Sequence, residues 1–526
     1  MSWQPQYRSS KYRHVFGKPA NKESCYDCVP ITRSVQDNHF CAVNPVFIAV
    51  VTECAGGGAF IVIPLQQSGK LDPHHPKVCG HRGNVLDIKW NPFDDYVIAS
   101  CSEDATVKIW DIPRHLLNKN LTDPRKELLG HTRRVGLIEW HPTASNIIFS
   151  TGYDYKIMIW NIDNDDPVIY SPVRTIECHK DVILSMSFNT DGSLLATSCK
   201  DRIIRVIDPR QGTIIQESNC KTHKASKVLF LGNMNMLLSS GTSRWNNRQA
   251  ALWDQNDLSV PLHQEDLDGS SEQNTKTYKY KKHSVYLSLG DGNIRYYEVC
   301  SQKPYLQYLN EYRSNLPQKG IGVLPKRGVD VSTCEVFRFY KLVTIKSLIE
   351  PVSMIVPRRS ESYQDDIYPM TTGTQPALTA REWLDGINRG PVLMSLKPGS
   401  KSAPYQVPVT KEEPKFPIPI KEPKLMYEGK VPTRTLWEIE YKTEIIREDR
   451  SNKKAFERLQ DSKQAISNGF DFFECPAPKT ENELLQMFYK QQEEIRRLRD
   501  QITQRDVQIK QLELEIKNKR NSTASY

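Results

Sequence analysis

The chain has 526 residues and a formal net charge of +9, with 71 Lys and Arg against 62 Asp and Glu. So small a charge over this length does not point to nucleic acid as the partner. Hydrophobic residues make up 38%, so part of the chain is expected to lie outside a packed core. No apolar run suffices to span a membrane, and the N-terminus lacks the apolar segment of a secretory signal. We therefore expect a cytoplasmic or nuclear protein whose cysteines are reduced.

The N-terminal segment is basic and aromatic, reading YRSSKYRHVFGK from Tyr7 to Lys18. One interpretation is a strand that closes a ring of repeats, with its charges on the solvent side. The segment can contact an acidic partner at the same time, and the two roles do not exclude each other. The cations that are candidates for this contact are Arg8, Lys11, Arg13 and Lys18.

A repeated unit begins at Gly80-His81 and again at Gly130-His131, and the two copies end in KIWD and MIWN. Short runs of alternating apolar residues, such as VLDIKW, predict strands between these landmarks. In both copies a His, a Ser, an Asp and a Trp follow one another at intervals of 19, 4 and 6 residues. The two sets are His81, Ser100, Asp104 and Trp110, and His131, Ser150, Asp154 and Trp160. This spacing resembles the structural tetrad of a WD40 propeller blade.

The residue types of the tetrad suit a buried chain of hydrogen bonds. The indole N–H needs an acceptor, the hydroxyl supplies it and donates to the imidazole, and the second imidazole N–H meets a carboxylate. A catalytic triad is the alternative, but a nucleophilic serine must be exposed and is not normally duplicated from repeat to repeat. We interpret the set as structural. The lone CxxC at Cys25 and Cys28 lacks a second pair, and nucleotide-binding motifs are absent, so we expect no enzyme activity, no cofactor and no metal.

Later copies of the repeat depart from this pattern. The third has Ile207 in place of Trp, and the fifth keeps Asp291 six residues before Tyr297. The remaining tetrad positions are assigned to His179, Thr197 and Asp201 in the third copy, and to His223, Ser243, Asn247 and Trp253 in the fourth. With strand-rich stretches before and after them, the copies make seven blade-sized units. They predict an all-β fold, a seven-bladed WD40 β-propeller over residues 1–345.

Residues 346–396 are expected to form an extension that packs on the propeller. A short helix is predicted over Leu378–Asn388, with Thr379 as its N-cap. Its apolar face consists of Trp383, Leu384 and Ile387. A helix this short is marginal in water, so it should dock on the ring.

Residues 397–475 form a linker rich in proline, lysine and other charged residues, for which an extended, poorly ordered spacer is the expectation. The segment KFPIPIKEP within it also resembles a polyproline II ligand. From 480 to 517 an apolar residue recurs in heptads, which predicts a C-terminal α-helical coiled coil. Its core is expected to consist of Leu484, Phe488, Ile495, Leu498, Ile502, Ile509, Leu512 and Ile516. We expect a parallel homo-oligomer, with dimer, trimer and tetramer left open; a helix packed on its own propeller is the alternative.

Several segments together resemble the coronin family. They include SSKYRHVFGKP at 9–19, HFCAVNPVFIAVV at 39–51, VCGHRGNVLDIKWNPF at 78–93 and MIVPRRSESYQDDIYP at 354–369. TSRWNNRQ, GDGNIRYYE and TENELLQMFY make the chain most similar to the class II coronins, in their A form. The resemblance implies a non-enzymatic, actin-filament-binding regulator of the cytoskeleton and an oligomeric interaction scaffold. Its expected partners are actin filaments, other copies of itself through the coil, and other cytoskeletal or regulatory proteins.

The chain departs from the family at three places. In the coil, Gln508 precedes Ile509, so the arginine-to-glutamate clasp of trimeric coronin coils cannot form with Glu513. Many coronins carry an arginine linked to filament binding where this chain has Pro30. Residues 272–283, EQNTKTYKYKKH, replace a segment that is usually aromatic and apolar. The alternative reading is therefore a WD40 scaffold subunit of a nuclear or signalling multiprotein complex without direct actin contact.

Overall fold

The computed structural model describes residues 10–399, apart from 13, 35, 54–56, 115–116, 219–222, 244, 246, 269–275, 281–283, 289–290 and 361, together with Arg497. The chain divides into two units between Lys415 and Phe416, and the described residues other than Arg497 belong to the first. The predicted coiled coil and its core residues, most of the linker, and the candidate contacts Arg8 and Arg13 lie outside the described residues.

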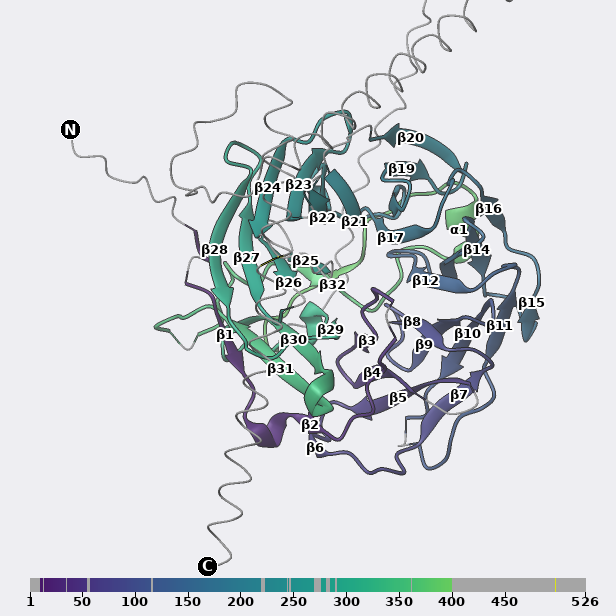
Figure 1. Cartoon of the computed structure of the whole chain (residues 1–526), viewed down its shortest axis with the longest axis horizontal. Helices are drawn as coiled ribbons and strands as arrows, with labels where there is room; N and C mark the ends of the chain where they lie inside the picture. Colours follow the sequence, from purple (N-terminus) through teal and green to yellow (C-terminus); the bar gives the residue numbers. More distant parts are fainter. Residues whose placement is uncertain are drawn as a thin grey trace, which may run out of the picture. The chain divides into compact units, whose positions relative to one another are not determined.

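The first unit is a mostly-β WD40 propeller, in which sheets stand side by side around a centre (Figure 1). Among the described residues, seven sheets have four or more strands. Sheet 1 contains β3 (Cys41–Val43), β4 (Phe47–Thr52), β5 (Gly58–Pro64) and β7 (Lys77–His81). Sheet 2 contains β8 (Val85–Trp90), β9 (Val97–Ser102), β10 (Thr106–Asp111), β11 (Lys126–Leu129) and β15 (Val168–Ile169). Sheet 3 contains β12 (Val135–Trp140), β13 (Ile147–Gly152), β14 (Ile157–Asn161) and β16 (Arg174–Ile176).

The next three sheets are four-stranded antiparallel meanders. Sheet 4 contains β17 (Ile183–Phe188), β18 (Leu195–Cys199), β19 (Ile204–Asp208) and β20 (Thr213–Glu217). Sheet 5 contains β21 (His223–Phe230), β22 (Met236–Ser243), β23 (Arg248–Asp254) and β24 (His263–Asp268). Sheet 6 contains β25 (Lys276–Tyr280), β26 (Ser284–Ser288), β27 (Ile294–Val299) and β28 (Leu306–Tyr312). The divergent segment 272–283 thus contains β25, which pairs with β26.

Sheet 7 joins the two ends of the propeller sequence. It contains β29 (Gly320–Val323), β30 (Glu335–Val343), β31 (Leu348–Ile355), β1 (Phe16–Pro19), β2 (Tyr26–Asp27) and β6 (Gly69–Lys70). The N-terminal strand β1 pairs antiparallel with β31, so that Phe16 lies opposite Ile355, and Figure 1 shows the purple strand alongside the green one. Residues from both sides of position 345 therefore share one sheet.

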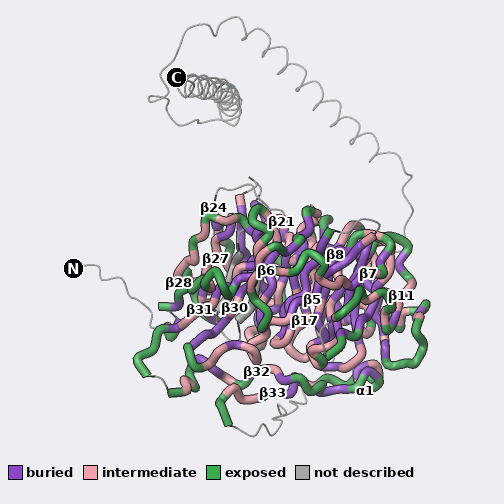
Figure 2. Tube along the Cα trace, turned by 90° about the horizontal axis from the view of Figure 1, so that it is seen from below, coloured by how far each residue is buried: buried purple, intermediate pink, exposed green. Residues whose placement is uncertain are grey.

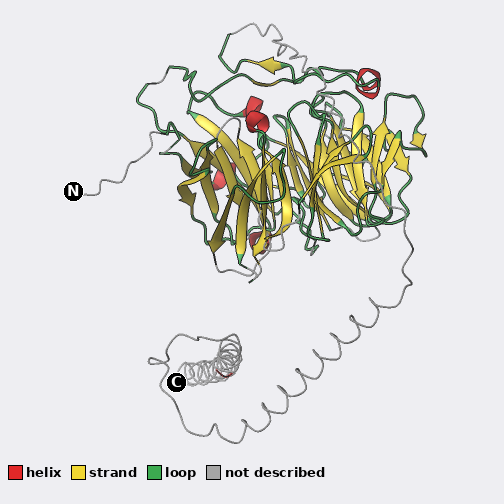
Figure 3. Ribbon diagram, turned by 90° about the horizontal axis from the view of Figure 1, so that it is seen from above, coloured by secondary structure: helices red, strands yellow, loops and turns green. Residues whose placement is uncertain are grey.

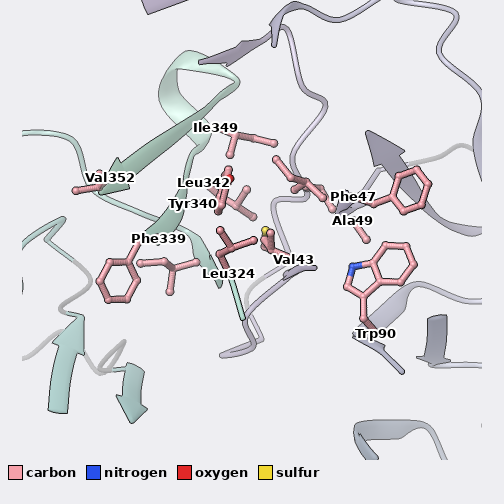
Figure 4. Packing of buried hydrophobic residues seen from close by; sticks show 14 of the residues in the cluster. Val43, Phe47, Ala49, Trp90, Leu324, Phe339, Tyr340, Leu342, Ile349 and Val352 are labelled. Carbon is pink, nitrogen blue, oxygen red and sulfur yellow. The ribbon is translucent and has the colours of Figure 1, made fainter. Parts of the chain in front are cut away.

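The hydrophobic core is divided among the spaces between neighbouring sheets. One cluster joins sheets 2 and 3, a second joins sheets 4 and 5, and a third joins sheets 5 and 6. The largest cluster connects sheets 1, 2, 6 and 7, and Figure 4 shows its side chains from β3, β4, β8, β30 and β31 packed against one another. The strands pass through the thickness of the ring (Figure 3), and the buried residues gather inside it (Figure 2). Burial of these apolar side chains between neighbouring sheets stabilises the ring.

The extension lies on one face of the ring, where Figure 2 labels β32 (Thr371–Thr372), β33 (Leu393–Met394) and α1 (Ala380–Leu384). Thr379 is the N-cap in a capping box with Glu382, which confirms the predicted helix start. The helix is shorter than the predicted Leu378–Asn388, because Gly386 with a φ of +99° turns the chain out of the helix. The 3-10 turns are η1 (Lys22–Ser24), η2 (Gly232–Met234), η3 (Lys326–Gly328) and η4 (Thr344–Lys346).

One buried tryptophan contributes to the docking of the extension. Trp383 is fully buried in a cluster with residues of sheets 3 and 4. Its ring lies 4.8 Å from that of His141, and the Arg210 guanidinium stacks 4.8 Å above it. Arg210 also donates to the carbonyl of Ile387 at 2.8 Å. The Ile387 side chain itself is exposed, so its predicted place on the docking face was wrong: the turn at Gly386 points it away.

Among the described residues, no helix is long and apolar enough to cross a membrane. Within the same residues, no group of three or more His, Cys, Asp or Glu is arranged to hold a metal ion.

Candidate functional site

The first tetrad is a buried chain of hydrogen bonds between two sheets. Trp110 Nε1 donates to Ser100 Oγ at 2.8 Å, and Ser100 Oγ lies 2.7 Å from His81 Nε2. His81 Nδ1 lies 2.9 Å from the Asp104 carboxylate. Because the serine oxygen accepts from the indole, its own proton goes to Nε2, and Nδ1–H donates to the carboxylate. His81 is the last residue of β7 in sheet 1, whereas Ser100 and Trp110 belong to sheet 2. These hydrogen bonds therefore connect two neighbouring sheets.

The second tetrad repeats this geometry. Trp160 Nε1 donates to Ser150 Oγ at 2.8 Å, Ser150 Oγ lies 2.8 Å from His131 Nε2, and His131 Nδ1 lies 2.9 Å from Asp154. Ser150 and Trp160 are fully buried. Solvent and substrate cannot reach this serine, so it cannot attack an acyl group as a catalytic nucleophile would. The geometry therefore supports the structural interpretation, in which the tetrad holds the sheets together.

The aspartates of both tetrads are held as carboxylates. Burial alone would raise the pKa of Asp104, but the hydrogen bond from His81, with donation from Thr106 and the Arg82 N–H, holds that pKa below its ordinary value. The pKa of Asp154 is likewise lowered, against the effect of its burial, by His131 and two backbone N–H groups. Each turn therefore carries a fixed negative charge that orients the imidazole.

The third repeat keeps only part of the network. His179 Nε2 lies 2.9 Å from Thr197 Oγ1, but Ile207 provides no donor. The carboxylate of Asp201 pairs instead with the buried Arg205 guanidinium at 2.7 Å. Burial, together with the charge of Arg205, lowers the pKa of His179 to about 4, so this imidazole is neutral at physiological pH.

In the fourth repeat, the assignment of Ser243 was wrong, because the hydroxyl of the network belongs to Ser239. Trp253 Nε1 donates to Ser239 Oγ at 2.8 Å, and Ser239 Oγ lies 2.8 Å from His223 Nε2. Ser243 lies at the end of β22, where its hydroxyl accepts the N–H groups of Trp245 and Asn247. The predicted turn residue Asn247 does not reach the imidazole either: Gln249 Oε1 contacts His223 Nδ1 at 2.8 Å.

Sheet register explains the difference. In sheet 2, Trp110 lies opposite Ile98, and Ser100 follows two residues later. In sheet 5, Trp253 lies opposite Leu237, and Ser239 follows two residues later. The serine therefore has the same cross-strand position relative to the tryptophan in both sheets. The hairpin between β22 and β23 is longer, so more residues separate the serine from the tryptophan along the sequence.

A loop at residues 36–39, which sequence reasoning missed, ties four sheets together at the centre of the ring. The Asn38 amide donates to the carbonyls of Leu86 at 2.6 Å and Gly136 at 2.9 Å, on the inner strands of sheets 2 and 3. Lys227 of sheet 5 donates to the Asp37 carbonyl at 2.8 Å, and Ile321 of sheet 7 donates to the carbonyl of the next residue, His39. The sequence of this segment is polar, but an ordinary surface turn has the same composition. The composition alone therefore could not identify the segment as a central contact.

The two described candidate cations of the N-terminal segment have different surroundings. The Lys11 ammonium donates to the backbone carbonyl of Asp366 in the extension. Lys18 lies in β1 and is exposed. Pro30, the position at which the chain departs from many coronins, is also exposed. Of these residues, Lys18 and Pro30 are therefore presented on the surface, while Lys11 also holds the N-terminal segment against the extension.

An exposed apolar edge is a further surface feature that sequence reasoning did not identify. Ile214 and Ile215 of β20 are exposed, and β20 is the outer strand of sheet 4. Tyr170 and Val173, which flank the outer strands of sheets 2 and 3, are exposed as well. Two consecutive isoleucines in an outer strand point to opposite faces, so the pair exposes apolar surface whichever way the strand faces. Such surfaces are typical of protein contacts.

Comparisons with known families agree with this architecture. Residues 75–111, 122–161 and 170–208 match the family model of the WD domain, G-beta repeat, and residues 349–391 match a type of WD40 repeat. Residues 5–70 match a domain of unknown function, DUF1899. The WD40 match over 349–391 spans β31 of the ring and α1 of the extension.

Curated relatives are similar to the chain over nearly its whole length. Human coronin-2A is 67% identical over 99% of both chains, and bovine coronin-2A is 66% identical over 99% of both. Human coronin-2B is 59% identical over 99% of this chain and 98% of its own. Among solved structures, the WD40 domain of Toxoplasma gondii coronin superposes with a TM-score of 0.67 at 25% identity, covering 74% of this chain and 98% of that one.

Proposed function

This chain belongs to the coronin family, and from this membership we propose that it binds actin filaments and acts as an oligomeric scaffold in the cytoskeleton. Coronins are non-enzymatic, actin-regulating WD40 proteins. The observation that carries the proposal is the 67% identity to human coronin-2A over 99% of both chains. A similarity that runs through the ring, the extension and the C-terminal region favours a shared mode of action. The proposed location follows the family: cytoplasm, at the cytoskeleton.

The proposed architecture is a rigid ring of seven blades followed by the extension, the linker and a coil. Seven sheets with four or more strands among the described residues support this blade number. A ring without open edges offers a broad rigid surface, and a coil over 480–517 would hold several such surfaces together. Because filament subunits repeat, tethered weak contacts gain avidity by about 10²–10⁴ where geometry allows simultaneous binding.

Basic residues of the N-terminal segment are the proposed contact with an acidic filament surface. Lys18 is the clearest candidate, because it is exposed on β1 and its side chain makes no ion pair with another described residue. Arg8, Lys11 and Arg13 belong to the same proposed set. Contacts of exposed cations are screened by salt, so the affinity should fall as ionic strength rises.

Co-sedimentation of the full-length protein with actin filaments tests this function. We expect pelleting that depends on filaments and weakens between low and physiological salt. Lys18→Glu should weaken the binding, while Lys119→Glu, which changes an exposed lysine in the connection between β10 and β11, should leave it unchanged. Equal pelleting with and without filaments at low salt would rule out direct binding.

The exposure of Pro30 favours a second candidate function. Many coronins carry a filament-binding arginine at the corresponding position, and proline can supply neither charge nor an N–H donor there. A WD40 scaffold in a nuclear or signalling complex, without direct actin contact, would not need that arginine. An affinity purification that recovers regulatory proteins but no actin would select this function over the first.

A further inference from the structure

We propose that Ser362 is a phosphorylation site for an arginine-directed serine kinase, and that its phosphate releases the N-terminal segment from the extension. The site lies in the loop 357–366, which follows β31 and is called here the extension loop. The proposal is independent of actin binding. It stands on the exposure of the loop, on its sequence of charges and on the contacts of Asp366.

Most described residues of the extension loop are exposed, and the residues that flank the loop are buried. Val356 and Ile367 flank it and are 2% and 0% exposed. Between them, Arg359 and Ser362 are exposed, and the Arg358 side chain, which is paired with Asp366, is 27% exposed. A kinase can therefore reach the serine without unfolding the ring, because the segment that it must bind already lies outside the packed sheets.

The charges around Ser362 suit a kinase whose peptide groove is acidic. Arg359 lies three residues before Ser362 and Arg358 four residues before it. Within the described residues, Arg359 makes no ion pair, so it is available to such a groove. Charge patterns of this kind are how kinases discriminate among serines.

The Ser362 hydroxyl is held near a second hydroxyl at the surface. Ser362 Oγ lies 2.7 Å from Ser360 Oγ, and the Ser362 N–H donates to Ser360 Oγ at 3.2 Å. In the reaction, Ser362 Oγ attacks the γ-phosphorus of ATP, and the bond from that phosphorus to the β,γ-bridging oxygen breaks. ADP leaves, and the hydroxyl proton passes to the catalytic aspartate of the kinase.

Asp366 connects the extension loop with the N-terminal segment. Its carboxylate pairs with Arg358 at 2.6 Å, and its backbone carbonyl accepts from the Lys11 ammonium. The next residue after Lys11 is Tyr12, which is buried. Asp366 thus holds both Arg358, which lies four residues before Ser362, and Lys11, which anchors the start of the described chain.

A phosphate on Ser362 would compete with Asp366 for Arg358. It carries about −1.5 to −2 charges and three acceptor oxygens, and its hydrogen bonds to guanidinium are stronger than those of neutral groups. It also repels the carboxylates of Asp365 and Asp366, which follow closely in the loop. Loss of the Arg358 ion pair frees Asp366 to move, and the contact of its carbonyl with Lys11 weakens.

The first experiment tests the site. Full-length protein is incubated with ATP and a purified arginine-directed serine kinase, and phosphopeptides are located by mass spectrometry. We expect phosphate on Ser362, none in Ser362→Ala, and retention in Ser360→Ala. Arg359→Ala should slow the reaction at least about tenfold, since one charge-assisted contact is lost. No incorporation, or incorporation that Ser362→Ala leaves unchanged, would overturn the proposal.

The second experiment tests the release. Hydrogen exchange is compared for residues 10–20 in the phosphorylated and unmodified proteins. We expect faster exchange after phosphorylation, and the same increase in unmodified Arg358→Ala, which removes the ion pair directly. Kinase-treated Ser362→Ala should exchange like the unmodified protein. Equal exchange in the phosphorylated and unmodified proteins, with an unchanged melting temperature, would refute the release.

Discussion

At the scale of single residues, two tryptophans with the same burial differ in how their N–H groups are satisfied. Trp110 and Trp383 are both fully buried. The N–H of Trp110 donates to Ser100, whereas that of Trp383 finds no hydrogen-bond partner among the described residues. Burying an N–H without a partner costs free energy, while breaking an existing bond strands the acceptor. The two positions should therefore respond differently to the same substitution.

We predict that Trp110→Phe lowers the free energy of unfolding by ~1–3 kcal/mol, because Ser100 loses its donor. Trp383→Phe keeps most of the ring packing and removes an unbonded N–H, so we expect a loss of less than ~1 kcal/mol. Urea unfolding measures both. Trp245→Phe is the control, because its side chain is 75% exposed and should have almost no effect. Equal losses at Trp110 and Trp383 would contradict the hydrogen-bond assignment.

Asp104 makes the tetrad sensitive to acid. Its pKa in the folded protein lies below the ordinary value, chiefly because its contacts with His81 outweigh burial. A carboxyl with a lowered folded-state pKa stabilises the fold above its unfolded pKa of about 4 and loses that contribution as the pH falls. We predict that stability falls between about pH 5 and pH 2, and that Asp104→Asn, although less stable at neutral pH, shows a shallower fall. Stability curves across this range measure the difference.

Asp123→Asn is the matched control for this pH dependence. Asp123 is exposed and makes no ion pair with another described residue, so its substitution should reproduce the wild-type curve. If Asp104→Asn also runs parallel to the wild type throughout, the tetrad carboxylate does not contribute to acid sensitivity.

At the scale of elements, the register of sheet 5 decides which serine is structural. Ser239 is fully buried, and its hydroxyl bonds both Trp253 and His223. Among the described residues, the Ser243 hydroxyl accepts from the backbone N–H groups of Trp245 and Asn247 in the hairpin. We predict that Ser239→Ala costs ~1–3 kcal/mol, because two buried groups lose a partner, and that Ser243→Ala costs less. Chemical denaturation measures both losses of stability. A larger loss for Ser243→Ala than for Ser239→Ala would support the assignment of Ser243 that was made from the sequence spacing.

The stability of the short helix α1 depends on its packing against the ring. Helix α1 has five residues, far fewer than an isolated helix needs in water. Its capping box was readable from sequence, because Thr379 and Glu382 have the required spacing. Its docking partners were not, because His141 and Arg210 lie far away along the chain and reach Trp383 only through the arrangement of sheets 3 and 4.

At the scale of the whole molecule, the heptads of residues 480–517 predict self-association. We expect that deleting residues 480–520 leaves a folded, monomeric propeller. The double substitution Ile502→Asp with Ile509→Asp should also give a monomer, because each places an unpaired charge in the apolar seam. Sedimentation equilibrium at micromolar concentration measures the mass.

Two substitutions on the outside of the same helix provide the control. Gln504→Asp with Gln511→Asp adds the same charge one heptad apart at positions away from the seam, so the oligomer should persist. A wild-type protein that is monomeric would end the coiled-coil interpretation. A mass that the isoleucine substitutions leave unchanged would move the interface to the propeller.

Features that depend on local spacing could be predicted from the sequence. Equal intervals between His81, Ser100, Asp104 and Trp110 and their counterparts in the second copy predicted the hydrogen bonds between these side chains. Alternating apolar runs predicted strands, and the repeats predicted a propeller, because each repeat buries its faces only against its neighbours. Local spacing sufficed here because the hairpins of sheets 2 and 3 have equal lengths.

Features that depend on contacts between distant segments became visible in the folded structure. It replaced Ser243 with Ser239, because a longer hairpin shifts positions along the chain without changing the register across the sheet. It also placed residues 36–39 across the centre of the ring and Lys11 against Asp366. These contacts join segments up to 355 residues apart. Nothing in the local pattern encodes such pairs, since their partners meet only when the ring closes and the extension folds back onto it.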